Sequence, residues 1–213
     1  KRYGCKQWST ATVFASQILD AYYSYTSHQD KTIKLNSSGA TLHTYTTGGL
    51  GRFVTFGGTV VHTNGRDAMV KVTSLGAEAI LGAPLSRSLI LHNDRAFCAS
   101  GAVLYETAPG TYPSSTVDNF AGGATWTIGL GSEDIVGLAS IGRNLFIFTP
   151  TKVYIQTGYT KNERQTYLFS SAYGSCCIDS IKNVDIPEVG ASIIFLSSDN
   201  KICLLTMEGI RNI

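Results

Sequence analysis

Hydrophobic and polar positions alternate along most of this chain in short runs, and tight polar turns separate the runs. One order recurs four times: an apolar strand, a turn, a second apolar strand and a Gly-rich loop. The spacing between passes averages roughly 40–50 residues, which is the period of a propeller blade. They are RFVTFGGTVVHTNGRD (Arg52–Asp67), SLILHNDRAFCASGAVLYET (Ser88–Thr107), DIVGLASIGRNLFIFTPTKVYIQTG (Asp134–Gly158) and SIIFLSSDNKICLLTMEGI (Ser192–Ile210).

This repeat predicts an all-β fold of β-propeller-like antiparallel sheets. A single four-stranded sheet cannot bury both of its faces, whereas sheets stacked around an axis can. Four repeats and an opening segment predict about four to five blades, a number that allows an incomplete ring. We therefore divide the chain into an N-terminal segment, residues 1–51, and a repeat domain, residues 52–213.

The opening segment carries the best helix signal in the sequence. Apolar residues between Trp8 and Tyr25 follow a spacing of three and four, and Ser9 or Thr10 would cap the helix. The same stretch is rich in Thr, Val, Ile and Tyr, so a strand is the alternative. The following residues, up to Gly51, are predicted to form a hairpin and a loop.

Turn signals divide the repeats into hairpins. Thr73–Pro84 is predicted to be a connector that ends in a proline, and Thr107–Gly131 a long surface loop with one short strand. The predicted turns are Gly57–Gly58, Asn64–Gly65, His92–Asp94, Thr149–Thr151 and Ser198–Asn200.

Composition narrows the function classes. Hydrophobic residues make up 43% of the 213 residues and charged residues only 15%, so Ser, Thr, Asn and Gly are expected to dominate the surface. The net charge is +2, and Lys and Arg are scattered singly. Sequence-specific nucleic-acid binding needs a clustered basic stripe, which is missing, although a weakly charged channel for DNA remains compatible with this pattern.

The cysteines and the apolar runs indicate the compartment. Cys98 and Cys203 lie in apolar strands and are predicted to be buried thiols, whereas adjacent Cys176 and Cys177 would point to opposite faces of a strand. Together with Cys5 they make an odd number of cysteines, and no C-x-x-C spacing occurs. We therefore expect neither a disulfide framework nor a zinc site. We expect assembly in a reducing cytoplasm.

No membrane span is predicted, because no run of 18 apolar residues occurs. The polar start does not resemble a signal peptide. A first residue that is Lys is expected of a processed product or of part of a longer chain.

No catalytic, cofactor or metal site is predicted. The histidines, His28, His43, His62 and His92, lack metal-ligand spacing, and neither a G-x-S-x-G elbow nor a Walker motif occurs. Glu133 and Asp134 form the one acidic pair, and their side chains would diverge on a strand, so we expect a solvated turn rather than glycosidase carboxylates. Ser197 and Asp199 fit the S-x-D-x-G turn of sialidase-like propellers, with Lys201 in place of Gly, and such a turn is structural.

Two residue groups are candidates for contacts. Aromatic residues gather in and beside the long loop and predict either a self-packed loop or an anchor for a neighbouring subunit, with sugar stacking as a third alternative. They are Tyr105, Tyr112, Phe120 and Trp126. Four cations could face a lumen and a DNA backbone, or occupy solvated turns. They are Arg143, Lys152, Lys161 and Arg164.

The order of several motifs resembles a known group. The motifs are HTNGRD (His62–Asp67), LGAP (Leu81–Pro84), HNDRAFCASG (His92–Gly101), LYETAPG (Leu104–Gly110) and TIGLGSEDIVGLASIGRNLFIFTPTKVYIQTG (Thr127–Gly158). From Arg52 onward the chain resembles the β-propeller tail proteins of short-tailed bacteriophages, the nozzle or tail-tube proteins. The matching positions are Asn64–Gly65, Asn93, Arg95, Tyr105–Tyr112, Gly131–Leu138, Leu145–Gly158, Tyr173–Gly174 and Phe195–Asp199.

The resemblance implies a non-enzymatic structural protein of the virion, assembled in the host cytoplasm. It implies a homo-hexameric tail ring below the portal and adaptor, with fibres or spikes as outer partners and double-stranded DNA passing through the lumen during genome ejection. A carbohydrate- or protein-binding propeller is the alternative, and a glycoside hydrolase on the same scaffold is a further one.

Overall fold

The computed structural model describes residues 18–22, 25–28, 31–35, 37–56, 59–107 and 120–213. Within these residues the fold is all-β, with five four-stranded antiparallel sheets and two short 3-10 helices, η2 (Gly129–Gly131) and η3 (Ile178–Ser180). In every sheet the strands pair in sequence order, so each sheet is a simple meander.

We number the sheets I to V along the chain. Sheet I contains β1 (Ile18–Tyr22), β2 (Tyr25–His28), β3 (Thr32–Leu35) and β4 (Thr41–Thr44). Sheet II contains β5 (Arg52–Phe56), β6 (Thr59–Thr63), β7 (Val70–Thr73) and β8 (Gly76–Ala79). Sheet III contains β9 (Ser88–His92), β10 (Arg95–Ser100), β11 (Val103–Glu106) and β12 (Thr125–Thr127). Sheet IV contains β13 (Gly137–Ile141), β14 (Asn144–Phe148), β15 (Val153–Thr157) and β16 (Gln165–Ser170). Sheet V contains β17 (Lys182–Ile186), β18 (Gly190–Leu196), β19 (Ile202–Thr206) and β20 (Gly209–Asn212).

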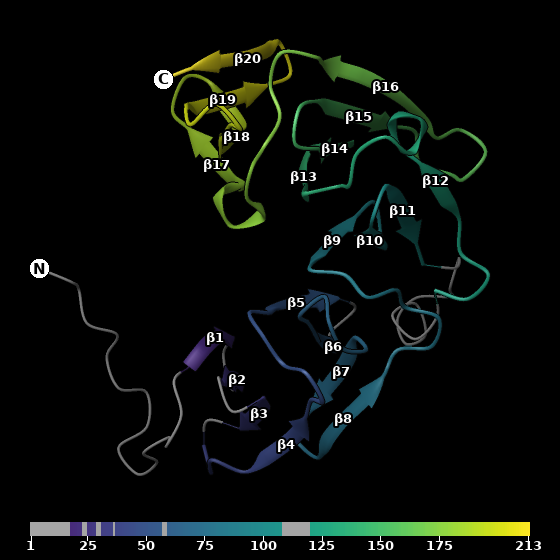
Figure 1. Cartoon of the computed structure of the whole chain (residues 1–213), viewed down its shortest axis with the longest axis vertical. Helices are drawn as coiled ribbons and strands as arrows, with labels where there is room; N and C mark the ends of the chain where they lie inside the picture. The colour runs from purple at the N-terminus through teal and green to yellow at the C-terminus, as the bar shows by residue number, and fades with distance from the viewer. Residues whose placement is uncertain (1–17, 23–24, 29–30, 36, 57–58, 108–119) are drawn as a thin grey trace, which may run out of the picture.

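The five sheets follow one another around an arc (Figure 1). Their first strands are neighbours, since β1 contacts β5, β5 contacts β9, β9 contacts β13 and β13 contacts β17. These strands therefore line the inner side of the arc, and the later strands of each sheet lie further out. Sheets I and V are the two ends of the arc and lie apart in Figure 1.

Successive turns lie at opposite ends of each meander, which gives the arc two rims. The β9–β10 turn of sheet III and the β15–β16 turn of sheet IV lie at one rim, where Tyr159 Oη donates to Asp94 Oδ2 at 2.9 Å. The second turns and the connections between sheets lie at the other rim, where Ser198 Oγ donates to the Pro150 carbonyl. We call the rim with Asp94 and Tyr159 the lower rim, and the rim with Pro150 and Ser198 the upper rim.

Four hydrophobic clusters join neighbouring sheets, one at each junction. Strand β14 shows how the sequence allows this, because Leu145 and Ile147 face sheet III while Phe146 and Phe148 face sheet V. The cluster between sheets I and II contains Ile33, Tyr45, Val70 and Val72. The cluster between sheets II and III is built around Val61, Met69, Ala96 and Cys98. The cluster between sheets III and IV is built around Phe97, Leu104, Leu145 and Ile147. The last contains Phe146, Phe148, Ile193, Phe195 and Leu205.

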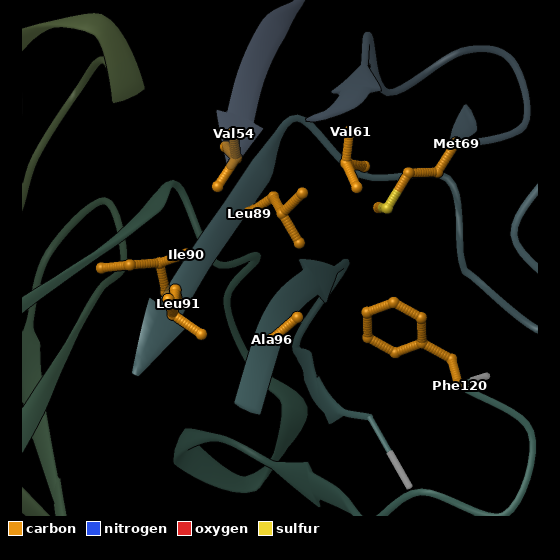
Figure 2. A pocket seen from close by; sticks show the side chains of 8 residues that line it. All are labelled: Val54, Val61, Met69, Leu89, Ile90, Leu91, Ala96 and Phe120. Atoms are coloured by element: carbon orange, nitrogen blue, oxygen red, sulfur yellow. The ribbon is translucent and has the colours of Figure 1, made fainter. Parts of the chain in front are cut away.

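A small void remains between sheets II and III. Figure 2 shows Val61 and Met69 on one side of it, with Leu89, Ala96 and Phe120 opposite. Its volume is about 10 Å³ and every lining side chain is apolar. A space of this size barely admits one water and offers that water no partner, so it is a packing defect rather than a binding site.

The structure corrects three predictions about secondary structure. The helix predicted over Trp8–Tyr25 is wrong where the chain is described, because Ile18–Tyr22 is strand β1 and pairs with β2; residues 8–17 lie outside the described residues. The connector predicted over Thr73–Pro84 contains strand β8. Residues 25–44 form three strands, one more than the predicted hairpin.

Other local predictions are confirmed. Asn93 and Asp94 form a two-residue turn with φ of 47° and 60°, and turns also occur at Thr149–Thr151 and Ser198–Asn200. Asn64–Gly65 opens a longer turn, in which Asn64 Oδ1 accepts the N–H groups of Arg66 and Asp67. The pair Gly57–Gly58 lies outside the described residues. The long loop does end in a short strand, β12.

The thiols of Cys98 and Cys203 are buried as predicted. Cys176 and Cys177 lie just before η3 rather than on a strand, one exposed and one half-buried, and Cys5 lies outside the described residues. In the part of the chain that the structure describes, no helix is long and apolar enough to cross a membrane.

Candidate functional site

The inner strands line an open cavity at the upper rim. The start of β5 contributes Arg52 and Phe53, the approach to β9 contributes Arg87, and the approach to β17 contributes Asp179 and Lys182. Its volume is about 440 Å³. Three of the five sheets therefore contribute residues to one concave surface on the inner side of the arc.

Asp179 joins two arginines across this cavity. Arg52 Nη2 donates to Asp179 Oδ1 at 2.7 Å and to the Ile178 carbonyl at 3.0 Å. Arg87 Nη2 donates to the other carboxylate oxygen at 3.3 Å. The hydrogen bond from Arg52 lowers the pKa of Asp179 below its usual value, and the charges of both arginines add to this effect. Asp179 is thus ionised at neutral pH.

The cavity has an excess of positive charge. Its lining contains Arg52, Arg87 and Lys182 but a single carboxylate, that of Asp179. The side chains stay hydrated, with exposed fractions of 29% for Arg52, 40% for Arg87 and 53% for Asp179. Guanidinium groups bind carboxylates and phosphates through paired N–H donors, so this surface is suited to an anionic group.

Local structure fixes the wall behind Arg52. Tyr45 Oη and His62 Nδ1 are 2.6 Å apart, and the His62 ring packs 4.6 Å from that of Phe53. A Cβ on Gly51 would lie 2.4 Å from His62 Nε2, so only glycine fits at this point of the chain. Burial lowers the pKa of His62 to about 4, with the nearby His43 as a second cause. His62 is therefore neutral and structural at pH 7.

The approach to Arg87 is held in a similar way. The Thr63 hydroxyl donates to the Ser86 carbonyl. Ser86 Oγ accepts the N–H groups of Ser88 at 3.0 Å and Ala99 at 3.2 Å. These buried hydrogen bonds fix the backbone next to Arg87, from which its side chain reaches Asp179.

A second charged cluster is buried between sheets III and IV. Glu106 Oε1 accepts a hydrogen bond from Arg164 Nη2 at 2.8 Å and forms an ion pair with Arg95, whose Nε lies 2.9 Å away. The Arg164 guanidinium group lies 4.7 Å from the centre of the Phe97 ring and 6.0 Å from that of Trp126. Only 1% of the Arg164 and Glu106 side chains is exposed, against 23% for Arg95, so the shared carboxylate joins the sheets and is closed to a ligand.

The four cations predicted to face a lumen do not share one environment. Arg164 belongs to the buried cluster, which corrects its predicted lumen-facing position. Arg143 and Lys161 are exposed in turns at the lower rim. Lys152 lies at the upper rim, where its Nζ is 3.6 Å from Glu133 Oε1. A shared lumen surface of these residues has no geometric support, and DNA contact by Arg143 or Lys161 stays a prediction.

The aromatic candidates pack largely within the chain. Phe120 is buried in the cluster between sheets II and III, and Tyr105 packs against the same cluster. Trp126 is half-buried against the cluster between sheets III and IV. Tyr112 lies outside the described residues. Intramolecular packing already explains the burial of three of the four, as the self-packed loop alternative predicts, and a subunit interface through them stays a prediction.

The acidic candidates stabilise turns. Glu133 Oε2 accepts from Thr149 Oγ1 at 2.6 Å and from the Thr151 N–H at 3.2 Å. The hydrogen bonds from the hydroxyls of these two threonines lower the pKa of Glu133 to about 2. In the β18–β19 turn the Ser197 hydroxyl donates to Asp199, which also pairs with Lys201. Both carboxylates are therefore committed to local structure.

The histidines form no metal site in the described chain. His43 and His62 pack around Tyr45, while His92 is buried beside Phe97 at a ring-to-ring distance of 5.9 Å. The described residues contain no group of three or more His, Cys, Asp or Glu side chains that could hold a metal ion.

Sequence reasoning missed the residues that line the cavity. Arg52, Arg87 and Asp179 are isolated charges without a motif, and their partners lie far away in the sequence. One signal was present, since Arg52 opens the first repeat and Arg87 directly precedes the second. Aligning the repeats by their first strands would have placed these charges at equivalent upper-rim positions.

No protein-family model matches the chain, and no curated protein matches it.

Proposed function

We propose that the chain is a non-enzymatic structural protein of a bacteriophage tail, a β-propeller subunit of the nozzle or tail-tube ring that surrounds the channel for genome ejection. The observation that carries the proposal is the succession of five four-stranded meanders with their first strands innermost. This is the construction of propeller blades. The identity of the assembly rests on the motif resemblance to tail proteins of short-tailed phages.

The positions of those motifs support the proposal. Asn93 and Arg95 flank the β9–β10 turn, Leu145–Gly158 is the β14–β15 hairpin, and Phe195–Asp199 ends β18 and enters its turn. The resemblance therefore follows the blade framework instead of an isolated loop. Because fold alone does not determine function, the tail assignment needs a test on particles.

The chemistry of the cavity favours binding over hydrolysis. Most glycoside hydrolases need two carboxyl groups about 5–10 Å apart, one of which carries a proton. The cavity lining contains one carboxylate, Asp179, and two arginines hold it ionised. Glu133 and Asp199 are engaged in their own turns.

Quantitative mass spectrometry of purified virions from the source of this sequence tests the tail assignment. We expect peptides of this chain in the particles, at a copy number that matches the proposed six-fold ring and with the portal as the internal standard. Peptides absent from particles, yet abundant in the lysate, would exclude a virion component.

A binding propeller is the second candidate, and the cationic cavity is the observation that favours it. An anionic glycan or an acidic peptide would satisfy Arg87 and Lys182. Binding of acidic oligosaccharides on a glycan array, lost in Arg87→Gln and retained in Lys161→Gln, would support this function. Equal signals from both variants would place binding elsewhere.

A further inference from the structure

The cavity at the upper rim carries more positive charge than its carboxylate can neutralise. Arg52, Arg87 and Lys182 line it, and Asp179 is the single acidic residue of the lining. Three cations and one carboxylate give this lining a net charge of +2. Each oxygen of Asp179 already accepts a hydrogen bond from one arginine, so Lys182 has no share in it. The cavity therefore favours a ligand that brings negative charge and further acceptor oxygens.

Arg87 has a hydrogen-bond donor that the fold leaves unused. A guanidinium group carries several N–H donors in a planar fork, and Asp179 engages Nη2 of Arg87. The Nε atom of Arg87 is buried and has no hydrogen-bond partner among the described residues. A buried donor without a partner is costly, so an acceptor supplied by a ligand would be stabilising at this point.

A glycine turn lets the Arg87 side chain follow its path into the cavity. A Cβ on Gly65 would lie 2.5 Å from Arg87 Cγ and 3.2 Å from its backbone nitrogen. Gly65 also has a φ of 75°, a conformation that other residues rarely adopt. Any side chain at this position would displace Arg87, so the Asn64–Gly65 turn is part of the construction of the cavity.

The remainder of the lining is apolar. Phe53 and Val54 of β5 and Leu89 of β9 are half-buried in it, and Leu50 completes this part of the wall. The volume of about 440 Å³ lies within the range of about 300–1,000 Å³ that is usual for small-molecule sites. Such sites combine apolar walls with a few polar groups that orient the ligand. This lining suits a compact body that carries one strongly anionic group.

We propose that the cavity is a binding site for a phosphomonoester, whose phosphate group replaces Asp179 as the shared acceptor of Arg52 and Arg87. A phosphomonoester carries a charge of about −1.5 to −2 at pH 7 and three strong acceptor oxygens. A carboxylate offers only two oxygens, whereas three allow one acceptor for each arginine and one for Lys182. The apolar wall takes the body of the ligand. The proposal concerns the cavity alone and does not rest on the tail assignment.

Asp179 acts as an internal stand-in for the ligand. Its pairs with Arg52 and Arg87 are hydrated, and ion pairs of this kind are weak, so their exchange for phosphate costs little. Asp179 lies in η3, directly before sheet V, whereas Arg52 begins β5 of sheet II and Arg87 precedes β9 of sheet III. Binding of the phosphate therefore releases a link that crosses the inner side of the arc.

Isothermal titration of the full chain with phenyl phosphate tests the site at pH 8, where the phosphate is a dianion because its second pKa is about 6. Phenyl sulfate is the matched probe, since it has nearly the same shape and a single negative charge. We expect phenyl phosphate to bind at least about tenfold more tightly. Equal affinities, or no binding of phenyl phosphate at millimolar concentration, would overturn the proposal whether or not the chain occurs in virions.

Two matched pairs of variants locate the binding. Arg87→Gln should weaken phenyl phosphate binding at least about tenfold, whereas Lys161→Gln, the same charge change at the lower rim, should bind like the wild type. Asp179→Asn removes the competing carboxylate and should bind more tightly, whereas Asp185→Asn, on an exposed position of β17 outside the lining, should not. Far-ultraviolet circular dichroism checks folding, and the Asp179 pair decides the question if Arg87→Gln unfolds. Equal effects within the pairs would show that affinity follows net charge alone, which would contradict the site.

Other ligands identify the source of the anionic group. A 5′-phosphorylated single-stranded oligonucleotide that binds while its unphosphorylated form does not would support the phosphate site and place its source at a chain end. Equal binding of both forms, tighter than that of phenyl phosphate, would show recognition of the phosphodiester backbone and refute the proposal. Tighter binding of phthalate, a dicarboxylate, would assign the cavity to carboxylates and refute it as well.

Discussion

The same group of three charges occurs twice in this protein, once buried and once exposed. Glu106 lies between Arg95 and Arg164 at the junction of sheets III and IV, and Asp179 lies between Arg52 and Arg87 at the central cavity. The exposed fraction is 1% for the Glu106 side chain and 53% for that of Asp179. The composition is equivalent, so burial alone separates a structural cluster from one that a ligand can reach.

Burial changes what each group contributes to stability. Charges removed from water lose hydration worth several kcal/mol each, and only close partners offset the loss. In the exposed cluster, water and salt screen the attraction, and such pairs contribute about 0–1 kcal/mol. The buried cluster should therefore be sensitive to the loss of any member, and the exposed cluster nearly indifferent.

Glu106→Ala is expected to have the largest effect. It leaves Arg164 charged and buried against Phe97 without a carboxylate, and removing one partner of a buried pair costs about 3–5 kcal/mol. Urea unfolding followed by circular dichroism measures the change in the free energy of unfolding. Asp179→Ala is the matched control, and equal losses in the two variants would refute the distinction between the clusters.

A histidine beside the buried cluster makes stability depend on pH. Burial, with the charge of Arg164 as a second cause, lowers the pKa of His92 to about 4. Between about pH 6.5 and pH 4, His92 therefore binds a proton in the unfolded chain but not in the folded chain. Stability should fall with acidification across this window, by at most about 3 kcal/mol from His92.

Unfolding measured at pH 7 and at pH 4.5 checks this expectation. The loss on acidification should be smaller in His92→Gln than in the wild type. His62 titrates in the same range and remains in both proteins, so the difference between them isolates His92. Identical pH dependence in the two proteins would exclude His92 as a source.

Local pattern predicted most of the sheets, because strand periodicity and turn residues are properties of adjacent positions. The β9–β10 hairpin follows directly from the Asn93–Asp94 turn between apolar runs. The helix prediction failed at Ile18–Tyr22 because three-and-four spacing competes with high strand propensity there, and pairing with β2 decided the outcome. Strand β8 was not predicted because its sequence, GAEA, has no β-branched or aromatic residue.

The charged clusters could not be predicted, since they depend on contacts between distant positions. Arg164 and Glu106 are 58 residues apart in the sequence, and Arg52 and Asp179 are 127 apart. As a cation in the polar segment TKNERQ, Arg164 has the sequence features of a surface residue. Only the packing of sheet IV on sheet III shows that it is buried and paired.

Arg164→Met tests the buried cluster from its other side. Met fills much of the space over Phe97, and Glu106 keeps its ion pair with Arg95, whose Nε lies 2.9 Å from Glu106 Oε1. Because the remaining carboxylate still has a charged partner, we expect a loss of about 2 kcal/mol, less than for Glu106→Ala. A double-mutant cycle with Glu106→Ala should give non-additive losses, and strict additivity would show that the two side chains are not coupled.

Asp179→Ala should have the smallest effect on stability and the clearest effect on charge. The lost pairs are hydrated, so we expect a change below about 1 kcal/mol that shrinks further in high salt. Because the folded-state pKa of Asp179 is lowered, its small contribution to stability is present above the ordinary carboxyl pKa and disappears on acidification.

The Asp179→Ala variant also releases Arg52 and Arg87 from their shared carboxylate, which leaves three unneutralised cations in the cavity. Isothermal titration with pyrophosphate should therefore show tighter binding to Asp179→Ala than to the wild type, whereas a loss of stability near that of Glu106→Ala would show that the cavity cluster is a structural element after all.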